Sequence, residues 1–168
     1  HLLSQKSGFS EYSGFAGWPI DWAGLQMAVE DGPNNTPGSA FNYENINYAL
    51  FRVIIPMMWA AVPGNPDVGS INSANISAQY VDYINQNIWQ RLDIHQTACL
   101  NPDPDPTLLY NQSGSSAGFD AGDWTALCGP TGWLLSANEL AKFMVYLRYT
   151  EDLLSDQSRE LMDELYLG

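Results

Sequence analysis

Two polar residues at the start of an apolar stretch have types and a spacing that could do chemistry. Tyr43 and Asn45 flank Glu44 and follow the turn-forming pair Pro37-Gly38. A phenol can pass on a proton during catalysis, and a carboxamide can hydrogen-bond a substrate. The alternative is an ordinary helix entrance, in which Asn45 caps the helix and Tyr43 packs against it. The spacing alone favours the helix entrance.

An amphipathic helix is expected to begin at this pair and to fix its position. Apolar residues recur at the i, i+4 and i+7 spacing of one helix face: Ile46, Leu50, Val53, Ile54 and Met57. Pro56 has no backbone N–H, so the helix is expected to kink there or to end soon after.

Helical patterns also occur on both sides of this element. A short helix is expected near 22–30, and a second from about 77 to 90, with a buried side made of Tyr80, Val81, Ile84, Ile88 and Trp89. Ser136 and Glu139 have the pattern of a capping box, which predicts a third helix with the buried stripe Leu140, Phe143, Met144 and Leu147. A last helix is expected after Ser155, burying Leu161, Met162 and Leu165. Because no segment has a strong strand pattern, the chain is expected to be mainly α, with long ordered loops and little or no sheet.

Composition limits the kinds of partner. The 168 residues are 45% hydrophobic, which is typical of a folded domain, and 19 acidic against 6 basic residues give a formal net charge of −13. That excess repels phosphate backbones, so nucleic-acid binding is not expected. No apolar run approaches the roughly 20 residues of a transmembrane helix, so no membrane span is expected.

The two cysteines leave two interpretations open. Cys99 and Cys128 either form a disulfide, which stabilises by roughly 3–4 kcal/mol on the chain-entropy model, or remain two buried free thiols. Three glycosylation sequons, at Asn34, Asn75 and Asn111, tip the expectation toward a periplasmic or secreted protein. The loop carboxylates Asp103, Asp105, Asp120 and Asp123 lack the spacing of a known Ca²⁺ loop, so neither a metal nor a cofactor is expected.

Four segments, taken in order, resemble one family. These are LLSQKSGF (2–9), PGSAFNYENINYALFRVII (37–55), NIWQRLDIHQT (87–97) and GPTGWLLSANELAKFM (129–144). They resemble the LL-[ST]-H-T-S-G, PG-x-x-F-x-Y-S-N, I-x-x-P-L-G-M-x-x-T and G-G-L-x-S-T-x-x-D-L-A-x-F segments of serine β-lactamase-like proteins. That family includes class C β-lactamases, D-alanyl-D-alanine carboxypeptidases and related esterases. The resemblance implies the helical lobe of the family's α/β fold.

The resemblance also implies an acyl-transfer mechanism. In the family a Ser-x-x-Lys serine attacks a carbonyl, and a Tyr-x-Asn motif assists it. By resemblance, Tyr43 would relay the serine's proton to the leaving group and Asn45 would hydrogen-bond the substrate amide. A tyrosine ordinarily loses its proton only near pH 10, so this role needs a nearby cation. Glu44 stands where the family has Ser and adds a carboxylate that disfavours a phenolate unless it points away, and Gln5-Lys6 replaces His-Thr.

The Ser-x-x-Lys and His-x-Gly motifs of the family do not occur in the chain. Neither lysine, Lys6 or Lys142, follows a serine by three positions, and neither histidine, His1 or His95, opens a His-x-Gly. Residues 1–168 are therefore expected to be a single partial domain, inactive by itself, from an enzyme that acts on a small-molecule or peptide acyl substrate. The surface left by the missing lobe is expected to favour self-association. The alternative is a stand-alone, non-catalytic binding or interaction domain derived from the same lobe.

Two other short patterns imitate the family's motifs. Lys6-Ser7-Gly8 spells Lys-[ST]-Gly but does not lie on an apolar strand pattern, and Tyr83-Ile84-Asn85 repeats Tyr-x-Asn in the middle of a predicted helix. Both are expected to be structural.

Overall fold

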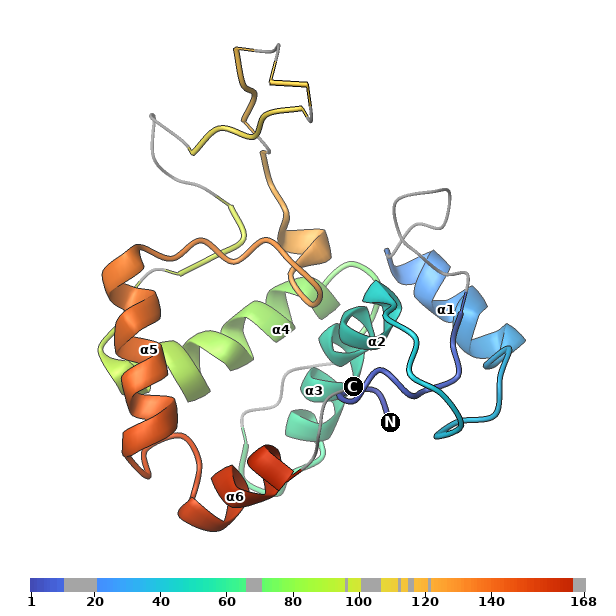
Figure 1. Cartoon of the computed structure of the whole chain (residues 1–168), viewed down its shortest axis with the longest axis horizontal. Helices are drawn as coiled ribbons and strands as arrows, with labels where there is room; N and C mark the ends of the chain where they lie inside the picture. Colours follow the sequence, from blue (N-terminus) through green and yellow to red (C-terminus); the bar gives the residue numbers. More distant parts are fainter. Residues whose placement is uncertain are drawn as a thin grey trace.

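The structure is a computed structural model that describes residues 1–10, 21–65, 71–95, 97–100, 107–111, 113–114, 117–120 and 122–164. Six α-helices are found in this part of the chain (Figure 1): α1 Trp22–Asp31, α2 Asn45–Ala49, α3 Phe51–Ala60, α4 Ile76–Ile84, α5 Ala137–Tyr149 and α6 Asp156–Glu164. The described residues form no strand, and their only ladder contacts are the isolated antiparallel bridges of Leu100 with Asp123 and of Leu109 with Phe119. The expectation of a mainly helical chain is confirmed for these residues.

Helix α1 is bounded by clear local signals. The Asp21 side chain accepts a hydrogen bond from the Gly24 N–H at 2.9 Å, which satisfies one of the amide donors at the helix start. At the other end Gly32 has φ 77°, and its N–H reaches the Ala28 carbonyl oxygen at 3.0 Å. Glycine adopts this left-handed conformation without a steric cost, so the helix can stop there and the chain can turn back.

The predicted helix after Asn45 is divided in two. Leu50 separates α2 from α3 but keeps right-handed helical angles, with φ −62° and ψ −29°. Pro56 lies inside α3, and the helix ends four residues later at Ala60, as the missing N–H leads one to expect. Ile46 and Leu50 are buried, whereas Met57 is 54% exposed. The apolar stripe therefore faces the core only along its first half, and the expectation for Met57 is wrong.

The predicted helix 77–90 is confirmed and extends slightly further. Helix α4 continues into a π-helical turn, Asn85–Trp89, and a 3₁₀ turn, Gln90–Leu92. Asp93 then adopts a left-handed conformation with φ 52°, which ends the helical path. Tyr80, Ile84 and Trp89 are buried, as the periodicity predicts.

The capping box at the start of α5 is confirmed. The Glu139 N–H donates to Ser136 Oγ at 3.2 Å, and Glu139 Oε2 accepts from the Ser136 N–H at 2.7 Å. The predicted buried stripe is only half right, because Phe143 packs in the core while Leu140 and Met144 are 50% and 46% exposed. Among the described elements α5 is covered on one side alone.

The burial predicted for the last helix is wrong. In α6, Leu161 is 57% exposed and Met162 is 47% exposed, and Leu165 lies outside the described residues. Polar contacts attach α6 to the rest of the chain instead. Arg148 of α5 donates to Asp163 at 2.7 Å, and Arg159 donates to the Leu154 carbonyl oxygen at 2.7 Å. The helix is present as predicted, but no described segment covers Leu161 or Met162.

Two apolar clusters hold the helices together. One joins α1 to α2 through the buried residues Leu25, Ala28, Ile46, Ala49 and Leu50. The other joins α4 to α5, because Phe143 and Tyr146 of α5 pack against a second group of buried residues: Tyr80, Ile84, Trp89, Leu92, Ile94, Cys99 and Cys128. In the second cluster the Trp89 ring meets Trp133 and Phe143 edge-on, with ring centroids 5.7 Å and 5.3 Å apart.

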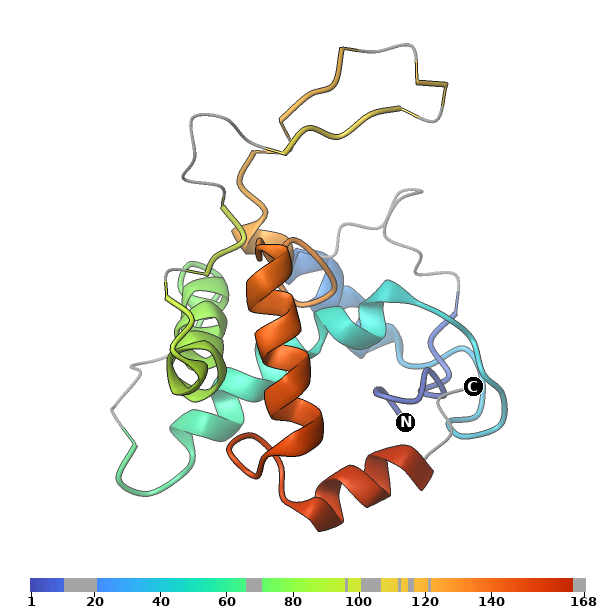
Figure 2. The same ribbon diagram turned by 60° about the vertical axis from the view of Figure 1, so that its left-hand side comes forward.

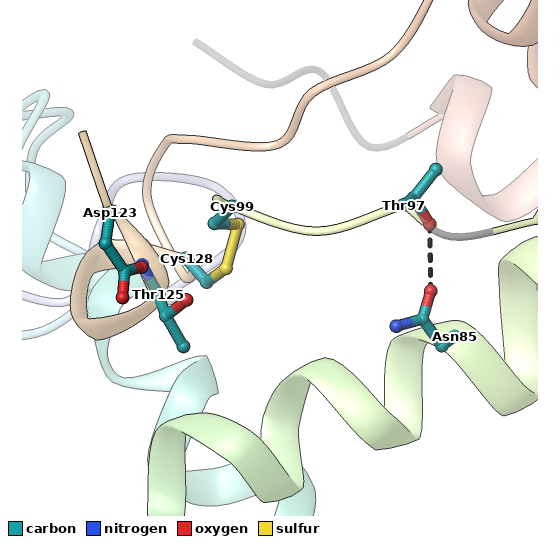
Figure 3. Close-up of a disulfide and its surroundings, with 6 residues drawn as sticks. All are labelled: Asn85, Thr97, Cys99, Asp123, Thr125 and Cys128. Carbon is teal, nitrogen blue, oxygen red and sulfur yellow. Dashed lines mark hydrogen bonds between the residues drawn. A yellow bond between two sulfur atoms is a disulfide. The ribbon is translucent and has the colours of Figure 1, made fainter. Parts of the chain in front are cut away.

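A disulfide joins the long loop region to the second cluster. Cys99 and Cys128 are bonded, with Cα atoms 5.8 Å apart, and both are almost fully buried (Figure 3). This settles the choice between a disulfide and free thiols. The described parts of the loop between them extend away from the helices as an arm in both views (Figures 1 and 2). The bridge between Leu109 and Phe119 closes that arm.

Candidate functional site

Tyr43 and Asn45 lie together at the entrance of α2. Tyr43 is 62% exposed, Glu44 is the residue that precedes the helix, and Asn45 is its half-buried first residue. The helix-entrance alternative required Asn45 to cap α2 and Tyr43 to pack. The structure shows neither, because Glu44 holds the cap position, without a side-chain capping hydrogen bond, and the phenol is exposed. Neither residue therefore has the structural role that the alternative gave it.

The Glu44 side chain points away from Tyr43. Glu44 has an extended backbone, with φ −140° and ψ 128°, and successive side chains of an extended segment point to opposite sides. Its side chain is 93% buried, in contrast to the exposed phenol of Tyr43, and Glu44 Oε1 accepts from Asn42 Nδ2 at 3.2 Å. The carboxylate that the sequence placed beside Tyr43 is thus turned inward, so it does not face a phenolate at Tyr43.

Gln5 connects the first segment of the chain to this entrance. Its Oε1 atom accepts from the Glu44 backbone N–H at 2.8 Å and from Asn47 Nδ2 at 2.6 Å. Its main-chain oxygen accepts from the Asn42 N–H at 2.8 Å. The sequence showed Gln5 only as a departure from the family's histidine. No local pattern could have revealed the contacts, because their partners lie about 40 positions away.

The segment that follows Gln5 is a loop that packs closely against Asn35. Gly8 has φ 89°, and a Cβ atom there would lie 2.2 Å from the Asn35 carbonyl oxygen, so only glycine allows this approach. Ser7 is buried and its Oγ accepts from the Phe9 N–H at 3.2 Å. Lys6-Ser7-Gly8 therefore lies in a loop and not on a strand, as expected for a structural imitation of Lys-[ST]-Gly.

The second Tyr-x-Asn pattern also has a structural explanation. Tyr83 packs edge-on against Trp59, with ring centroids 5.3 Å apart, and Ile84 is buried in the second cluster. The Asn85 carboxamide oxygen accepts from the Thr97 hydroxyl at 2.8 Å (Figure 3). All three side chains are used in packing or hydrogen bonding within the fold.

A buried guanidinium lies at the start of α3, close to the starts of α1 and α4. Arg52 of α3 is 1% exposed, and burial lowers the pKa of its guanidinium although the nearby Asp21 carboxylate opposes the shift. Burial likewise raises the pKa of the Tyr80 phenol, against an opposing hydrogen bond with Trp133. Arg52 lines a cavity of about 390 Å³ together with Ser73 and Ser77.

One exposed carboxylate on the described surface contacts two basic side chains. His95 Nε2 lies 2.8 Å from Asp93 Oδ1, and Lys142 Nζ lies 3.6 Å from the other oxygen of the same carboxylate. These contacts hold the pKa of the Asp93 carboxyl below its usual range, the His95 hydrogen bond being the larger cause. Within the described ranges no three His, Cys, Asp or Glu residues come together as a metal site. Asp103 and Asp105 lie outside those ranges.

The fold is shared with part of two solved structures. The chain superposes on an octameric penicillin-binding protein homologue from Pyrococcus abyssi with a TM-score of 0.63 and 21% identity, covering 95% of this chain and 36% of that one. It superposes on the D-amino acid amidase from Ochrobactrum anthropi SV3, solved with L-phenylalanine amide, with a TM-score of 0.58 and 18% identity. That match covers 93% of this chain and 44% of the amidase. At these identities the comparison establishes the fold alone.

Comparisons of the sequence with known proteins find no relative. No family profile matches the chain, and no curated protein matches it. The chain spans less than half the length of either solved structure. The expected fold class is therefore supported in its coarser form: a helical unit that corresponds to part of a penicillin-binding-protein-like fold. No helix of the described residues is long and apolar enough to cross a bilayer.

Proposed function

We propose that the chain is the helical lobe of a serine acyl-transfer hydrolase, in which Tyr43 and Asn45 contribute to the active site. The observation that carries the proposal is the geometry at the entrance of α2. Tyr43 is 62% exposed, while Glu44 beside it is buried and hydrogen-bonded. An exposed phenol on a fixed backbone suits a group that acts on a substrate outside this lobe. The likeness to two larger penicillin-binding-protein-like structures supports the same conclusion.

In this proposal the nucleophile comes from a second lobe. A serine hydroxyl oxygen would form a bond to the substrate's carbonyl carbon, and its proton would pass to Tyr43 in its phenolate form, which the lysine of the Ser-x-x-Lys motif would stabilise. The phenol would then give the proton to the leaving group as the acyl bond breaks, and water would later release the acyl group. The Asn45 carboxamide would hydrogen-bond the substrate amide. The substrate class is a small-molecule or peptide acyl compound, whether β-lactam, peptide or ester.

The extent of the two structural matches supports a two-lobe protein. The matches cover 95% and 93% of this chain, yet only 36% and 44% of the two solved structures. The rest of such a fold would supply the Ser-x-x-Lys and Lys/His-x-Gly motifs. The 168 residues alone should therefore be inactive.

The first test uses the complete protein that the proposal requires. Tyr43→Phe should lower turnover of nitrocefin, a p-nitrophenyl ester or a D-alanyl peptide by at least about 100-fold, within the usual range for a general acid–base group. Tyr110→Phe is the matched control, because Tyr110 is also 62% exposed but lies in the arm. Equal activity of Tyr43→Phe and Tyr110→Phe would contradict the catalytic role.

A second test uses the 168-residue chain. It should turn over none of these substrates, and turnover blocked by a serine-directed reagent would contradict the proposal. The alternative, a stand-alone binding domain, is distinguished by the flanking coding sequence. A Ser-x-x-Lys upstream and a Lys/His-x-Gly downstream support the hydrolase, whereas stop codons on both sides support the binding domain.

We also propose that the protein functions in the periplasm or outside the cell. The buried disulfide between Cys99 and Cys128 supports this location, because such bonds persist in oxidising compartments. Cell fractionation with a thiol-alkylation assay tests it. The native protein should resist alkylation until it is reduced, and a fully reduced cytosolic pool would contradict the proposed location.

A further inference from the structure

Gln5 holds the chain on both sides of Tyr43. Its main-chain oxygen accepts from the Asn42 N–H at 2.8 Å, and its side-chain oxygen accepts from the Glu44 N–H at 2.8 Å. The same side-chain oxygen accepts from Asn47 Nδ2 at 2.6 Å, one turn into the helical segment. Gln5 is 4% exposed, so water does not compete for these bonds.

We propose that Gln5 is a positioning residue, which fixes Tyr43 in its exposed orientation and turns Glu44 inward. The proposal rests on the proposed function, because it names a residue that serves the same site. Gln5 acts through the backbone and not on a substrate. Its contribution would be to hold the phenol where a reacting group can meet it, since small displacements of a catalytic group are costly.

The backbone conformation of Gln5 agrees with the proposed positioning role. Its φ of 55° lies in the left-handed region, and it is one of two non-glycine residues among the described positions with a positive φ. A side chain with a Cβ adopts this conformation rarely, and it persists where the surroundings determine it. Here the surroundings are three amide donors that converge on Gln5 from one segment, Asn42–Asn47.

The backbone N–H of Glu44 needs a hydrogen-bond acceptor from outside α2. Glu44 precedes α2, and the first N–H groups of a helix have no acceptor within the helix. The side chain of the third helical residue can accept this N–H, as Glu139 does for Ser136, but the Asn47 side chain at that position donates to Gln5 instead. Gln5 provides the acceptor from a segment 39 positions away. The helix entrance and the first segment are therefore coupled through one carboxamide.

The first experiment is hydrogen exchange on the wild-type chain, measured amide by amide with NMR. The Asn42 and Glu44 amides should exchange at least about tenfold more slowly than an unprotected amide of the same sequence. The Tyr43 amide between them, for which the described residues offer no acceptor, should exchange much faster. Equal, unprotected exchange at Asn42 and Glu44 would overturn the proposal without any variant.

The second experiment is Gln5→Met, which keeps the side-chain length and removes the acceptor. Exchange at Glu44 should accelerate by about tenfold or more, while the amides of α4 keep their wild-type rates. Gln26→Met is the matched control, because Gln26 is exposed and its side chain donates a hydrogen bond to Glu30 of its own helix, at 3.1 Å. Unchanged exchange at Glu44 in Gln5→Met would overturn the proposal.

The third experiment measures the activity of the complete protein. Gln5→Met should lower kcat by about tenfold or more and leave KM within about threefold, whereas Gln26→Met should change neither. Wild-type kcat in Gln5→Met, with Tyr43→Phe inactive, would overturn the positioning role. Full activity of Tyr43→Phe would instead overturn the proposed function, and faster exchange at Glu44 in Gln5→Met would still support Gln5 as the residue that fixes Tyr43.

Discussion

At the scale of single residues, the site depends on the direction in which neighbouring side chains point. Tyr43 and Glu44 are adjacent in sequence, but one is 62% exposed and the other is 7% exposed. The extended backbone at Glu44 produces this separation, and Gln5 holds the backbone in place. The Glu44 carboxylate, which is next to Tyr43 in the sequence, therefore does not lie beside the Tyr43 phenol.

Gly129 lies against the C-terminal end of α2, so its substitution should disturb the packing of that helix directly. A Cβ atom at this position would lie 2.9 Å from the Tyr48 carbonyl oxygen and 3.1 Å from the Ala49 Cα, both backbone atoms of the helix. Gly129→Ala should lower the free energy of unfolding by about 1–3 kcal/mol, measured by urea denaturation, because a rigid element must shift.

Gly64→Ala is the comparison for that measurement. Gly64 has φ +88° and open space around the added atom, so its substitution reports backbone strain without a collision. A change at Gly129 no larger than about 0.5 kcal/mol would show that the C-terminal end of α2 shifts easily, which would contradict a rigid contact there.

At the scale of elements, the capping box of α5 makes a measurable contribution. Ser136→Ala removes the acceptor for the Glu139 N–H, so we expect the free energy of unfolding to fall by about 1 kcal/mol. Ser136→Thr, which keeps a hydroxyl, should cost much less. Thermal and chemical denaturation measure both variants, and equal losses would argue against the capping hydrogen bond.

The same box predicts a dependence on pH. Hydrogen bonds from the Ser136 backbone and side chain hold the pKa of the Glu139 carboxyl below its ordinary value of 4.5. A group with a lowered pKa in the folded state contributes stability that is complete above its unfolded value and is lost as pH falls through the folded pKa. Wild type should therefore lose more stability between about pH 5 and pH 2 than Glu139→Gln does. Identical pH profiles of the two proteins would contradict this assignment.

At the scale of the whole molecule, the disulfide ties the loop region to the helices. Cys99 and Cys128 are 29 positions apart, so the chain-entropy model gives a stabilisation of about 3–4 kcal/mol. Reduction should lower Tm by roughly 10 °C in a chain of this size. A variant with both cysteines replaced by serine serves as the control and should not respond to reductant. An unchanged Tm of wild type on reduction would contradict the stabilising role.

The exposed apolar surface predicts self-association of the isolated chain. On α5, Leu140, Met144, Val145 and Tyr149 are between 46% and 82% exposed. In the proposed two-lobe protein such surface is available to the rest of the molecule, and in the isolated chain another copy can cover it. Sedimentation velocity at increasing concentration should detect oligomers.

Met144→Glu should weaken this association, because it places a charge within the apolar side of α5. Gln157→Glu on α6 adds the same charge at an exposed polar position and should leave association unchanged. A strictly monomeric wild type at high concentration would be the contrary result.

Local patterns in the sequence determined where most helices begin and end. Ser136 and Glu139 make the capping box as predicted, Pro56 is followed by the end of α3, and Gly32 ends α1 in a left-handed turn. These signals succeed because each depends on atoms within a few positions of the chain. The sequence also placed Tyr43 and Asn45 together at a helix entrance.

Only the tertiary structure decided which apolar faces are covered and which distant groups meet. The periodicity of α5 and α6 is real, yet Met144 and Leu161 are exposed, because burial depends on what another segment brings against the helix. The bond between Cys99 and Cys128, and the contacts of Gln5 with the entrance of α2, join positions far apart in the chain. Such contacts arise from packing, to which every element contributes, and no local pattern specifies them.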